Sequence, residues 1–193
     1  MNDEELQLVK AAAARDVQAY GVLVRKYQGL FFSLAFGMTG SREDAEDIAQ
    51  AGFITIYEKL GGFDGRRPFR NWAYTIILNK IRNHLRRKRL LNFLSLDSFT
   101  EPDGQPVQIA DGAQNTEDKA RENELLREIE AKLLELPPEL REAFVLFHFQ
   151  NNSVGDIAAL TGATENAVSI RLHRARAVLA ASLTGKLPGQ GEA

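Results

Sequence analysis

The fold of the C-terminal half is decided by the stretch Ser153-Val-Gly-Asp-Ile-Ala-Ala-Leu-Thr-Gly-Ala-Thr-Glu-Asn-Ala-Val-Ser-Ile-Arg-Leu-His-Arg-Ala-Arg176. Ser153 is placed to cap a short helix, and Asp156, three residues later, completes the pattern of a capping box. Gly162 supplies the permissive backbone of a turn, and Thr164 is placed to cap a second helix. The apolar side of that second helix, at steps of four, three and four, consists of Val168, Leu172, Ala175 and Leu179. The pattern predicts a helix-turn-helix.

The opposite face of this second helix is polar and cationic. It carries Asn166, Ser169, Ile170, Arg171, His173 and Arg174. In a helix-turn-helix this face enters the major groove of DNA. Duplex DNA binding is therefore the predicted role, and the alternative is a helical hairpin with a solvated basic face.

Charge is arranged in blocks along the 193 residues, although the formal net charge is only −2. Between Arg66 and Arg89 there are nine Lys or Arg residues and no acid, whereas between Asn92 and Asp118 there are six Asp or Glu residues and no Lys or Arg. A phosphate backbone responds to the local block and not to the mean. The near-neutral total is therefore compatible with nucleic-acid binding.

Composition argues against several classes of protein. The chain has no Cys, which removes disulfides and thiolate chemistry and suits a reducing cytoplasm. The N-terminus is acidic and no run of about 18 apolar residues exists, so we expect a cytoplasmic protein without a membrane span. His84, His148 and His173 lack metal-ligand spacing and no glycine-rich phosphate loop is present, so we expect no enzyme activity, cofactor, metal or small-molecule substrate. The acids from Glu43 to Asp47 fit the first turn of a helix better than a metal site.

Apolar residues recur at three- and four-residue steps along most of the chain, which predicts an all-α fold. This periodicity is lost where Pro, Gly and acidic residues gather, so we expect two small helical domains joined by an extended acidic linker. The expected limits are 1–91 for the first domain, 92–116 for the linker, 117–184 for the second domain and 185–193 for a frayed tail. The helices expected ahead of the helix-turn-helix span about 16–36, 41–60, 68–91, 117–136 and 139–149. Ser41 and Asp44 have the pattern of a second capping box.

The basic block coincides with the expected helix 68–91. Its core-facing side is predicted to contain Phe69, Trp72, Ala73, Ile76, Ile77 and Leu85. Its other side carries Thr75, Asn79, Arg82, Asn83 and Arg86. Arg can contact phosphate, Asn can pair with a base edge, and aromatic rings can stack on exposed bases. This chemistry favours nucleic acid over a plain solvated face, although aromatics at helical spacing are more often core than base platforms.

Four segments in the right order resemble an extracytoplasmic-function (group IV) sigma factor of the bacterial sigma-70 family, over about residues 17–183. They are Tyr20-Gly-Val-Leu-Val-Arg-Lys-Tyr27, Asp44-Ala-Glu-Asp-Ile-Ala-Gln-Ala-Gly-Phe53, Phe69-Arg-Asn-Trp72 with Asn79, and Arg171-Leu-His-Arg-Ala-Arg176. The resemblance implies a transcription initiation factor that binds core RNA polymerase and promoter DNA, recognises two promoter elements and promotes melting. It also implies an anti-sigma factor as partner, which we expect to clasp both domains and which can hold the protein at the inner membrane until it joins the nucleoid.

The resemblance further implies a division of labour. The first domain would bind the β′ clamp helices of polymerase through contact residues Asp44, Asp47, Gln50, Phe53 and Tyr57. Its loop and basic helix would recognise and melt the minus-ten element through Phe63, Arg66, Arg70, Trp72, Thr75, Asn79, Arg82, Asn83 and Arg86. The second domain would hold the β flap and read the minus-thirty-five element through Asn166, Ser169, Ile170, Arg171, His173 and Arg174. The linker would thread toward the RNA exit path.

Some positions depart from the family pattern. Thr75 replaces a frequent Arg, Asn83 a frequent Asp, and Gly155 a common Glu. The usual Thr-Val-Lys-Ser of the recognition helix is Ala-Val-Ser169-Ile170, which removes one cation. Two other functions stay open at the level of sequence. One is a helix-turn-helix repressor or activator that acts without joining polymerase, and the other is an N-terminal half that binds only protein. Whether the free chain is compact or extended is also open, because the linker permits both.

Overall fold

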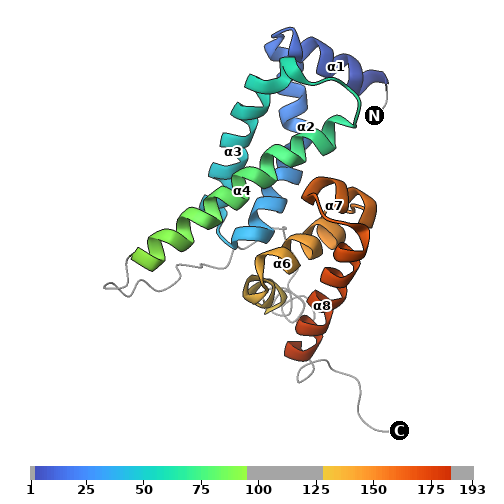
Figure 1. Cartoon of the computed structure of the whole chain (residues 1–193). Helices are drawn as coiled ribbons and strands as arrows, with labels where there is room; N and C mark the ends of the chain where they lie inside the picture. Colours follow the sequence, from blue (N-terminus) through green and yellow to red (C-terminus); the bar gives the residue numbers. More distant parts are fainter. Residues whose placement is uncertain (1–2, 95–127, 184–193) are drawn as a thin grey trace, which may run out of the picture.

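A computed structural model describes residues 3–94 and 128–183, and every regular element within these ranges is helical (Figure 1). The N-terminal half consists of α1 (Asp3–Ala13), α2 (Val17–Thr39), α3 (Arg42–Lys59), the 3-10 turn η1 (Leu60–Gly62) and α4 (Phe69–Leu94). The C-terminal half consists of a helical segment at 128–135, α6 (Pro138–Phe144), the π-helical turn η2 (Val145–Phe149), α7 (Val154–Thr161) and α8 (Glu165–Leu183). Within the described ranges, no helix combines the length and apolarity that crossing a bilayer requires.

Helix α2 is longer than predicted. Asp16 caps it by accepting hydrogen bonds from the backbone N–H groups of Gln18 and Ala19, but the helix passes through Gly37 and ends only at Gly40, whose φ is 68°. The expected end at Phe36 was therefore wrong by a turn. Gly37 lies inside the helix, and its lack of a side chain makes room for Val145, because a Cβ at residue 37 would lie 3.1 Å from Val145 Cγ1.

The capping box expected at Ser41 and Asp44 forms only in part. Ser41 caps α3 by accepting from the backbone N–H of Asp44, as predicted. The Asp44 carboxylate does not return to the Ser41 backbone but accepts from Lys88 Nζ of α4 at 3.1 Å. The reciprocal bond was a wrong prediction, because a cation on a neighbouring helix competes for the carboxylate.

Helix α4 is buried on two sides. One side packs on α2 and α3, where Gly52 lets the helices approach so closely that a Cβ would meet Ile77 Cδ1 at 2.2 Å. The other side faces the C-terminal half and carries Tyr74, Leu78 and Ile81, which are fully buried. The predicted core omitted these three, because its single stripe assumed one packed face. It correctly included Phe69, Ala73 and Ile77, while Trp72, Ile76 and Leu85 are partly buried.

The helix-turn-helix forms as the sequence predicts. Ser153 and Asp156 make a complete capping box on α7, and Gly162 ends that helix with φ 70°. Thr164 Oγ1 then accepts from the backbone N–H of Ala167 at the start of α8. The four predicted apolar residues of α8, Val168, Leu172, Ala175 and Leu179, are all buried. The helix expected at 139–149 is present, but its last turn is the π-helical η2.

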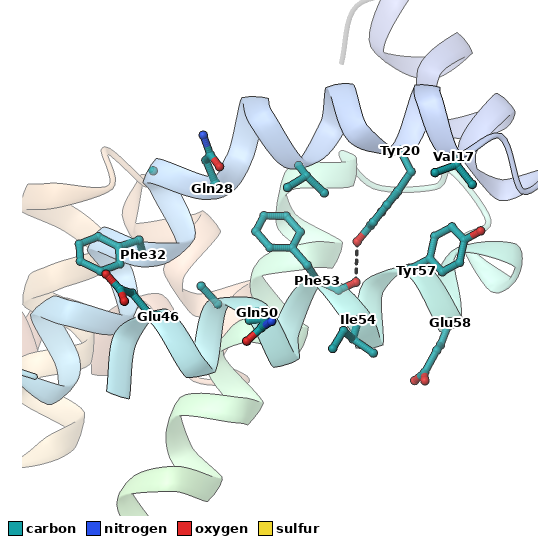
Figure 2. A pocket seen from close by; sticks show the side chains of 13 residues that line it. Val17, Tyr20, Gln28, Phe32, Glu46, Gln50, Phe53, Ile54, Tyr57 and Glu58 are labelled. Atoms are coloured by element: carbon teal, nitrogen blue, oxygen red, sulfur yellow. Dashed lines mark hydrogen bonds between the residues drawn. The ribbon is translucent and has the colours of Figure 1, made fainter. Parts of the chain in front are cut away.

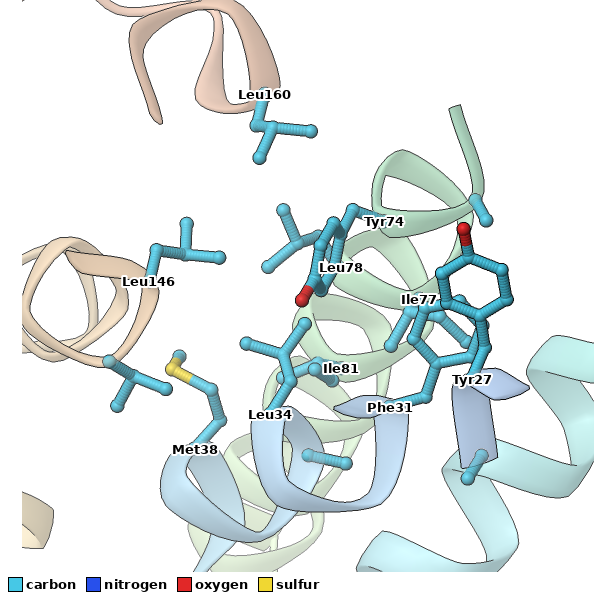
Figure 3. Close-up of a cluster of buried hydrophobic side chains, with 14 of the residues drawn as sticks. Tyr27, Phe31, Leu34, Met38, Tyr74, Ile77, Leu78, Ile81, Leu146 and Leu160 are labelled. Carbon is cyan, nitrogen blue, oxygen red and sulfur yellow. The ribbon is translucent and has the colours of Figure 1, made fainter. Parts of the chain in front are cut away.

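The two halves pack directly on each other. Helix α2 contacts α6 and η2, and α4 contacts α7. Figure 3 shows Leu34, Met38 and Leu78 of the N-terminal half in the same apolar cluster as Leu146 and Leu160 of the C-terminal half. The sequence left open whether the free chain is compact or extended. In the structure the two halves are packed together, and we call this the closed arrangement.

Two of the predicted segments lie partly outside the described residues. Helix α4 continues to Leu94, three residues into the expected linker 92–116, because no Pro or Gly interrupts it before that point. The rest of that linker, the first part of the expected helix 117–136 and the tail 185–193 are outside the described ranges.

Candidate nucleic-acid interface

The solvent side of α4 presents amide and guanidinium groups in one strip. Asn79, Asn83 and Arg86 are exposed there, and Thr75 is partly exposed. Arg86 Nη2 donates to Asn83 Oδ1 at 3.0 Å, and the Thr75 hydroxyl donates to the backbone carbonyl of Asn71 at 3.0 Å. The helix therefore brings four of the predicted minus-ten residues together, with groups suited to base edges and phosphates.

Three aromatic rings gather where α4 begins. The ring centroids of Phe63 and Trp72 are 5.3 Å apart, and Phe69 lies 5.8 Å from each. Phe69 is buried in the core, as aromatics at helical spacing often are, whereas Phe63 and Trp72 are only partly buried. Their free edges offer a surface on which an unpaired base can stack.

The loop that carries Phe63 and leads into α4, residues 63–68, is held in shape by Asp64. Its Oδ1 accepts from the backbone N–H of Arg66 at 3.0 Å, and Gly65 adopts φ 70°. The Arg66 side chain is 88% exposed and only 3.5 Å from Asp64 Oδ2 at its Nε. An ion pair so exposed contributes little free energy, so Arg66 can exchange it for a phosphate.

The remaining two cations of the predicted minus-ten set, Arg70 and Arg82, point toward the C-terminal half. Arg70 Nη2 donates to the backbone carbonyl of Gln150, and its guanidinium carbon lies 5.1 Å from the centroid of the Tyr74 ring. Arg82 makes two hydrogen bonds to the Glu142 carboxylate, one of them 3.3 Å long from Nε. Burial raises the pKa of Tyr74, although the hydrogen bond from Arg70 opposes the shift. These two arginines are thus occupied by protein groups.

The face predicted to read duplex DNA is open along α8. Asn166, Ser169, His173 and Arg174 are exposed, Arg171 is partly exposed, and Ile170 is 44% exposed although apolar. The buried stripe on the opposite side fixes this orientation. Further along the helix, Arg176 lies over the Phe147 ring and its Nε donates to His148 Nε2 at 3.4 Å. Burial, together with the charge of Arg176, lowers the pKa of His148.

A groove of about 880 Å³ runs between α2 and α3 (Figure 2). Gln50, Phe53 and Tyr57 line it, so three of the five predicted polymerase-binding residues share this surface. Its opposite wall is formed by residues of α2 that include Tyr20 and Phe32. The Tyr20 hydroxyl donates to the backbone carbonyl of Phe53, and burial raises the pKa of Tyr20 to about 12.

The other two predicted polymerase-binding residues lie outside this groove. Asp47 is exposed on α3. Asp44 faces α4, where its carboxylate lies 3.1 Å from Lys88 Nζ and 3.2 Å from His84 Nε2. Burial alone would raise the pKa of Asp44, but the hydrogen bond from Lys88 and the charges of His84 and Lys88 lower it. Asp44 therefore fastens α3 to α4 in this arrangement.

Sequence reasoning missed the α2 wall of the groove and the residues that join the halves. Tyr20 and Val24 of α2 line the groove, although the sequence analysis gave neither of them a role in binding polymerase. The signal was present, since the apolar positions of α2 cover more of its circumference than one packed face needs. Glu142 and Gln150 were not singled out, because their partners lie in the other half of the chain and no local pattern indicates them.

A helical bundle with an exposed basic helix, followed by a helix-turn-helix, is the architecture of a DNA-binding transcription protein. Comparison with known proteins specifies it further. The family model for Sigma-70 region 2 matches residues 23–90, and that for Sigma-70, region 4 matches residues 126–179. The chain therefore belongs to the sigma-70 family and, within it, to the extracytoplasmic-function group. Its members bind core RNA polymerase and direct it to promoters.

Individual relatives agree with this assignment. The chain is 30% identical over 172 residues to the ECF RNA polymerase sigma factor SigW of Bacillus subtilis, covering 89% of this chain and 92% of SigW. It is 33% identical over 191 residues to the RNA polymerase sigma factor CnrH of Cupriavidus metallidurans, covering 95% and 97%. The solved structure of CnrH in complex with the cytosolic domain of CnrY superimposes with a TM-score of 0.69 at 28% identity, covering 96% of this chain and all of that one.

Proposed function

We propose that the basic strip and aromatic cluster of α4 recognise and melt the minus-ten element, while α8 reads the minus-thirty-five element. The observation that carries this proposal is the coexistence of two DNA-facing helices of different chemistry in one chain. The strip on α4 combines Asn and Arg with partly buried rings, which suits unpaired bases. The face of α8 is a helix-turn-helix surface, which suits duplex DNA.

At the minus-ten element, we assign the bases and the phosphates to different residues. A base flipped from the non-template strand stacks beside Phe63 and Trp72, and Asn79 reads its edge. Arg66, Arg70, Arg82 and Arg86 neutralise phosphates along the strand, while Thr75 and Asn83 complete the surface. Unpairing a base costs a few kcal/mol, and these contacts offset that cost. Because phosphate neutralisation releases counterions, binding falls steeply with salt.

At the minus-thirty-five element, the recognition helix combines polar and apolar contacts. Asn166, Arg171, His173 and Arg174 supply donors for bases and phosphates. The exposed Ile170 offers an apolar surface to a thymine methyl group. Ser169 is uncharged where the family often has Lys, so this helix makes one phosphate contact fewer.

The groove between α2 and α3 is the proposed contact with the β′ clamp helices of polymerase. Its α3 side is largely apolar, with Phe53, Ile54 and Tyr57, and Gln50 belongs to the same side (Figure 2). An amphipathic helix docks in such a groove through its apolar side. Asp47 is exposed on the same helix and is assigned to the same contact, whereas Asp44 would have to release Lys88 of α4 to join it. The β flap is assigned to the C-terminal half.

Control by an anti-sigma factor is part of the proposal. CnrH was solved with the cytosolic domain of CnrY, and the sigma factor RpoE of Bartonella quintana was solved with the anti-sigma factor NepR. We infer that this chain is a non-enzymatic initiation factor that acts in the cytoplasm, where its polymerase is, and that an anti-sigma factor clasps both halves. Cross-linking that finds only one half engaged would count against the clasp.

The test of function is transcription with bacterial core polymerase from DNA upstream of the protein's own operon. Specific initiation is expected only when both are present. Changing Arg86 to Ala should reduce initiation severalfold, whereas Arg25→Ala, which removes an exposed cation on α2, should not. Tight duplex binding without polymerase, and no initiation with it, would favour the repressor reading instead.

A further inference from the structure

Arg15, in the turn between α1 and α2, has an unusual backbone. Its φ is 71°, and among the non-glycine residues of the described ranges only Asn151 also has a positive φ. The turn is a Schellman motif, because the backbone N–H of Arg15 donates to the carbonyl of Ala12 and that of Asp16 to the carbonyl of Ala11. This position of the motif favours Gly or Asn, so a long side chain there carries a cost in backbone strain.

The side chain of Arg15 reaches across to Tyr57, near the end of α3. Its guanidinium carbon lies 4.9 Å from the centroid of the Tyr57 ring, and its Nη1 donates to the Tyr57 backbone carbonyl at 3.3 Å. The planar guanidinium thus contacts the ring and the backbone of the same residue. Two contacts from one rigid group restrict the ring more than either contact alone would.

Tyr57 also contacts a ring from α2. The centroids of Tyr57 and Tyr20 are 4.8 Å apart, with an angle of 51° between the ring planes. The Tyr20 hydroxyl donates to the backbone carbonyl of Phe53, one turn before Tyr57 on α3. Figure 2 shows the two tyrosines next to each other at one end of the groove between α2 and α3. The position of the Tyr57 ring therefore shapes that end of the groove.

Arg15 itself lies outside the groove. Tyr20 and Tyr57 are among the side chains that line it, and Arg15 is not. Arg15 is exposed, in the turn that precedes α2, whereas Tyr57 is half-buried. A protein docked in the groove would touch Tyr57 directly, and Arg15 would influence that contact through the tyrosine.

Restricting Tyr57 in advance favours binding. A tyrosine side chain that is free to change rotamer loses this freedom when a partner immobilises it, and the loss weakens affinity. When only part of the molecules have the binding-competent rotamer, the apparent dissociation constant rises in inverse proportion to that fraction. A cation held over the ring increases the competent fraction before the partner arrives.

We propose that Arg15 is a positioning residue for the polymerase contact, which holds Tyr57 beside Tyr20 so that this end of the groove is preformed in the free protein. The inference rests on the proposed role of the groove between α2 and α3. The strained turn is the other side of the same arrangement. The chain gives up some folding stability at Arg15 in exchange for a docking surface that is already in shape.

Arg15→Asn tests this proposal. Asn tolerates the left-handed backbone and has no guanidinium, so the turn is kept while the contacts with Tyr57 are lost. The affinity for core polymerase should fall about two- to fivefold, the range that an exposed cation–π contact corresponds to. The thermal midpoint of the free protein should change little, because relief of strain offsets the lost contact. Wild-type affinity in the variant, or a fall in affinity only in proportion to a fall in the midpoint, would overturn the positioning role.

Kinetics separate positioning from direct contact. Because Arg15 acts on the free protein, Arg15→Asn should lower the association rate constant with immobilised core polymerase about two- to fivefold and leave the dissociation rate constant unchanged. Faster dissociation with unchanged association would mean that Arg15 touches polymerase itself. That outcome would also contradict the proposal.

Three further variants serve as controls. Arg25→Asn removes an exposed cation of α2 that does not line the groove, and it should bind polymerase like the wild type. Arg15→Lys keeps a cation for the ring and should retain most of the affinity. In a Tyr57→Leu background, Arg15→Asn should cause no further loss, because the ring it acts through is gone. Losses that add in the double variant would show that Arg15 acts elsewhere.

Failure of this inference can be told from failure of the proposed function. Ile54→Glu places a charge in the groove itself, away from Arg15 in the sequence. If Ile54→Glu binds polymerase like the wild type, the groove is not the contact and the proposed function is wrong at this point. If Ile54→Glu loses binding while Arg15→Asn does not, the groove stands and only the role of Arg15 is wrong.

Discussion

Gly40 and Gly162 have nearly the same backbone conformation, but the requirement for glycine differs between them because their surroundings differ. Gly40 ends α2 with φ 68°, and Gly162 ends α7 with φ 70°. A Cβ at residue 40 would meet Leu134 Cδ1 at 2.2 Å, whereas nothing lies within 4 Å of a Cβ at residue 162. Gly162 is needed only for the left-handed turn, and Gly40 is needed also for the approach of the C-terminal half.

We therefore predict different costs for the same substitution. Gly162→Ala should lower the free energy of unfolding by about 1–2 kcal/mol, the cost of a left-handed Ala. Gly40→Ala should cost a further 1–3 kcal/mol, roughly, because Leu134 must move as well. Urea denaturation of the two variants measures the difference. Equal losses would show that Leu134 does not constrain residue 40.

At the scale of the element, α7 depends on its capping box. The hydrogen bond from the Ser153 hydroxyl lowers the pKa of Asp156, and burial opposes the shift only in part. A carboxylate whose pKa is lowered in the folded state stabilises that state above its unfolded pKa of about 4. This stabilisation is lost as the pH falls through the folded pKa.

We predict that Asp156→Asn costs about 1 kcal/mol of stability near pH 6, as losing a cap does, and much less near pH 3. Denaturant titrations of the wild type and the variant over this range measure the gap. Ser153→Ala should cost a similar amount, and the double variant little more than either, because the two side chains act as one box. A gap that is independent of pH would contradict the role given to the carboxylate.

The recognition helix α8 allows a prediction about charge. Ser169→Lys should tighten binding of the polymerase complex to promoter DNA and make the slope of log affinity against log salt steeper by about 0.9, one phosphate contact. Gln7→Lys adds the same charge at an exposed position of α1, in the other half of the chain, and should leave the slope unchanged. Filter-binding titrations at several salt concentrations measure both. Identical slopes in the two variants would place Ser169 away from DNA.

Sequence patterns predicted the elements better than their relations. The helix-turn-helix could be predicted residue by residue, because a cap, a glycine and an apolar stripe are local signals. Helix α4 could be located, but Tyr74, Leu78 and Ile81 were missed, because the prediction assumed one packed face although these three residues recur at steps of four and three. No local pattern, by contrast, indicates that Arg82 pairs with Glu142, which lies in the other half of the chain. Contacts across large sequence separations depend on tertiary packing, which periodicity does not describe.

At the scale of the whole molecule, the proposed surfaces are distributed over different helices. The groove lies between α2 and α3, the melting strip on α4 and the duplex-reading face on α8. A change on one surface should therefore leave the other two intact. This separation makes the groove testable without disturbing DNA contacts.

We predict that Ile54→Glu weakens binding to core polymerase at least tenfold, because Ile54 lines the apolar groove and is 56% exposed. Its exposure means that folding should survive the change. Val22→Glu introduces the same charge at an exposed apolar position of α2 outside the groove, and should bind normally. The affinity of both variants for core polymerase is measured by their competition with a fluorescently labelled wild-type protein. If Ile54→Glu binds like the wild type, the groove is not the polymerase contact.

The apolar cluster shared by the two halves also has a consequence for how the molecule unfolds. One continuous apolar core extends through both halves and includes Met38, Leu78, Leu146 and Leu160. The two halves should behave as a single cooperative unit, and heating should produce one calorimetric transition with equal van't Hoff and calorimetric enthalpies.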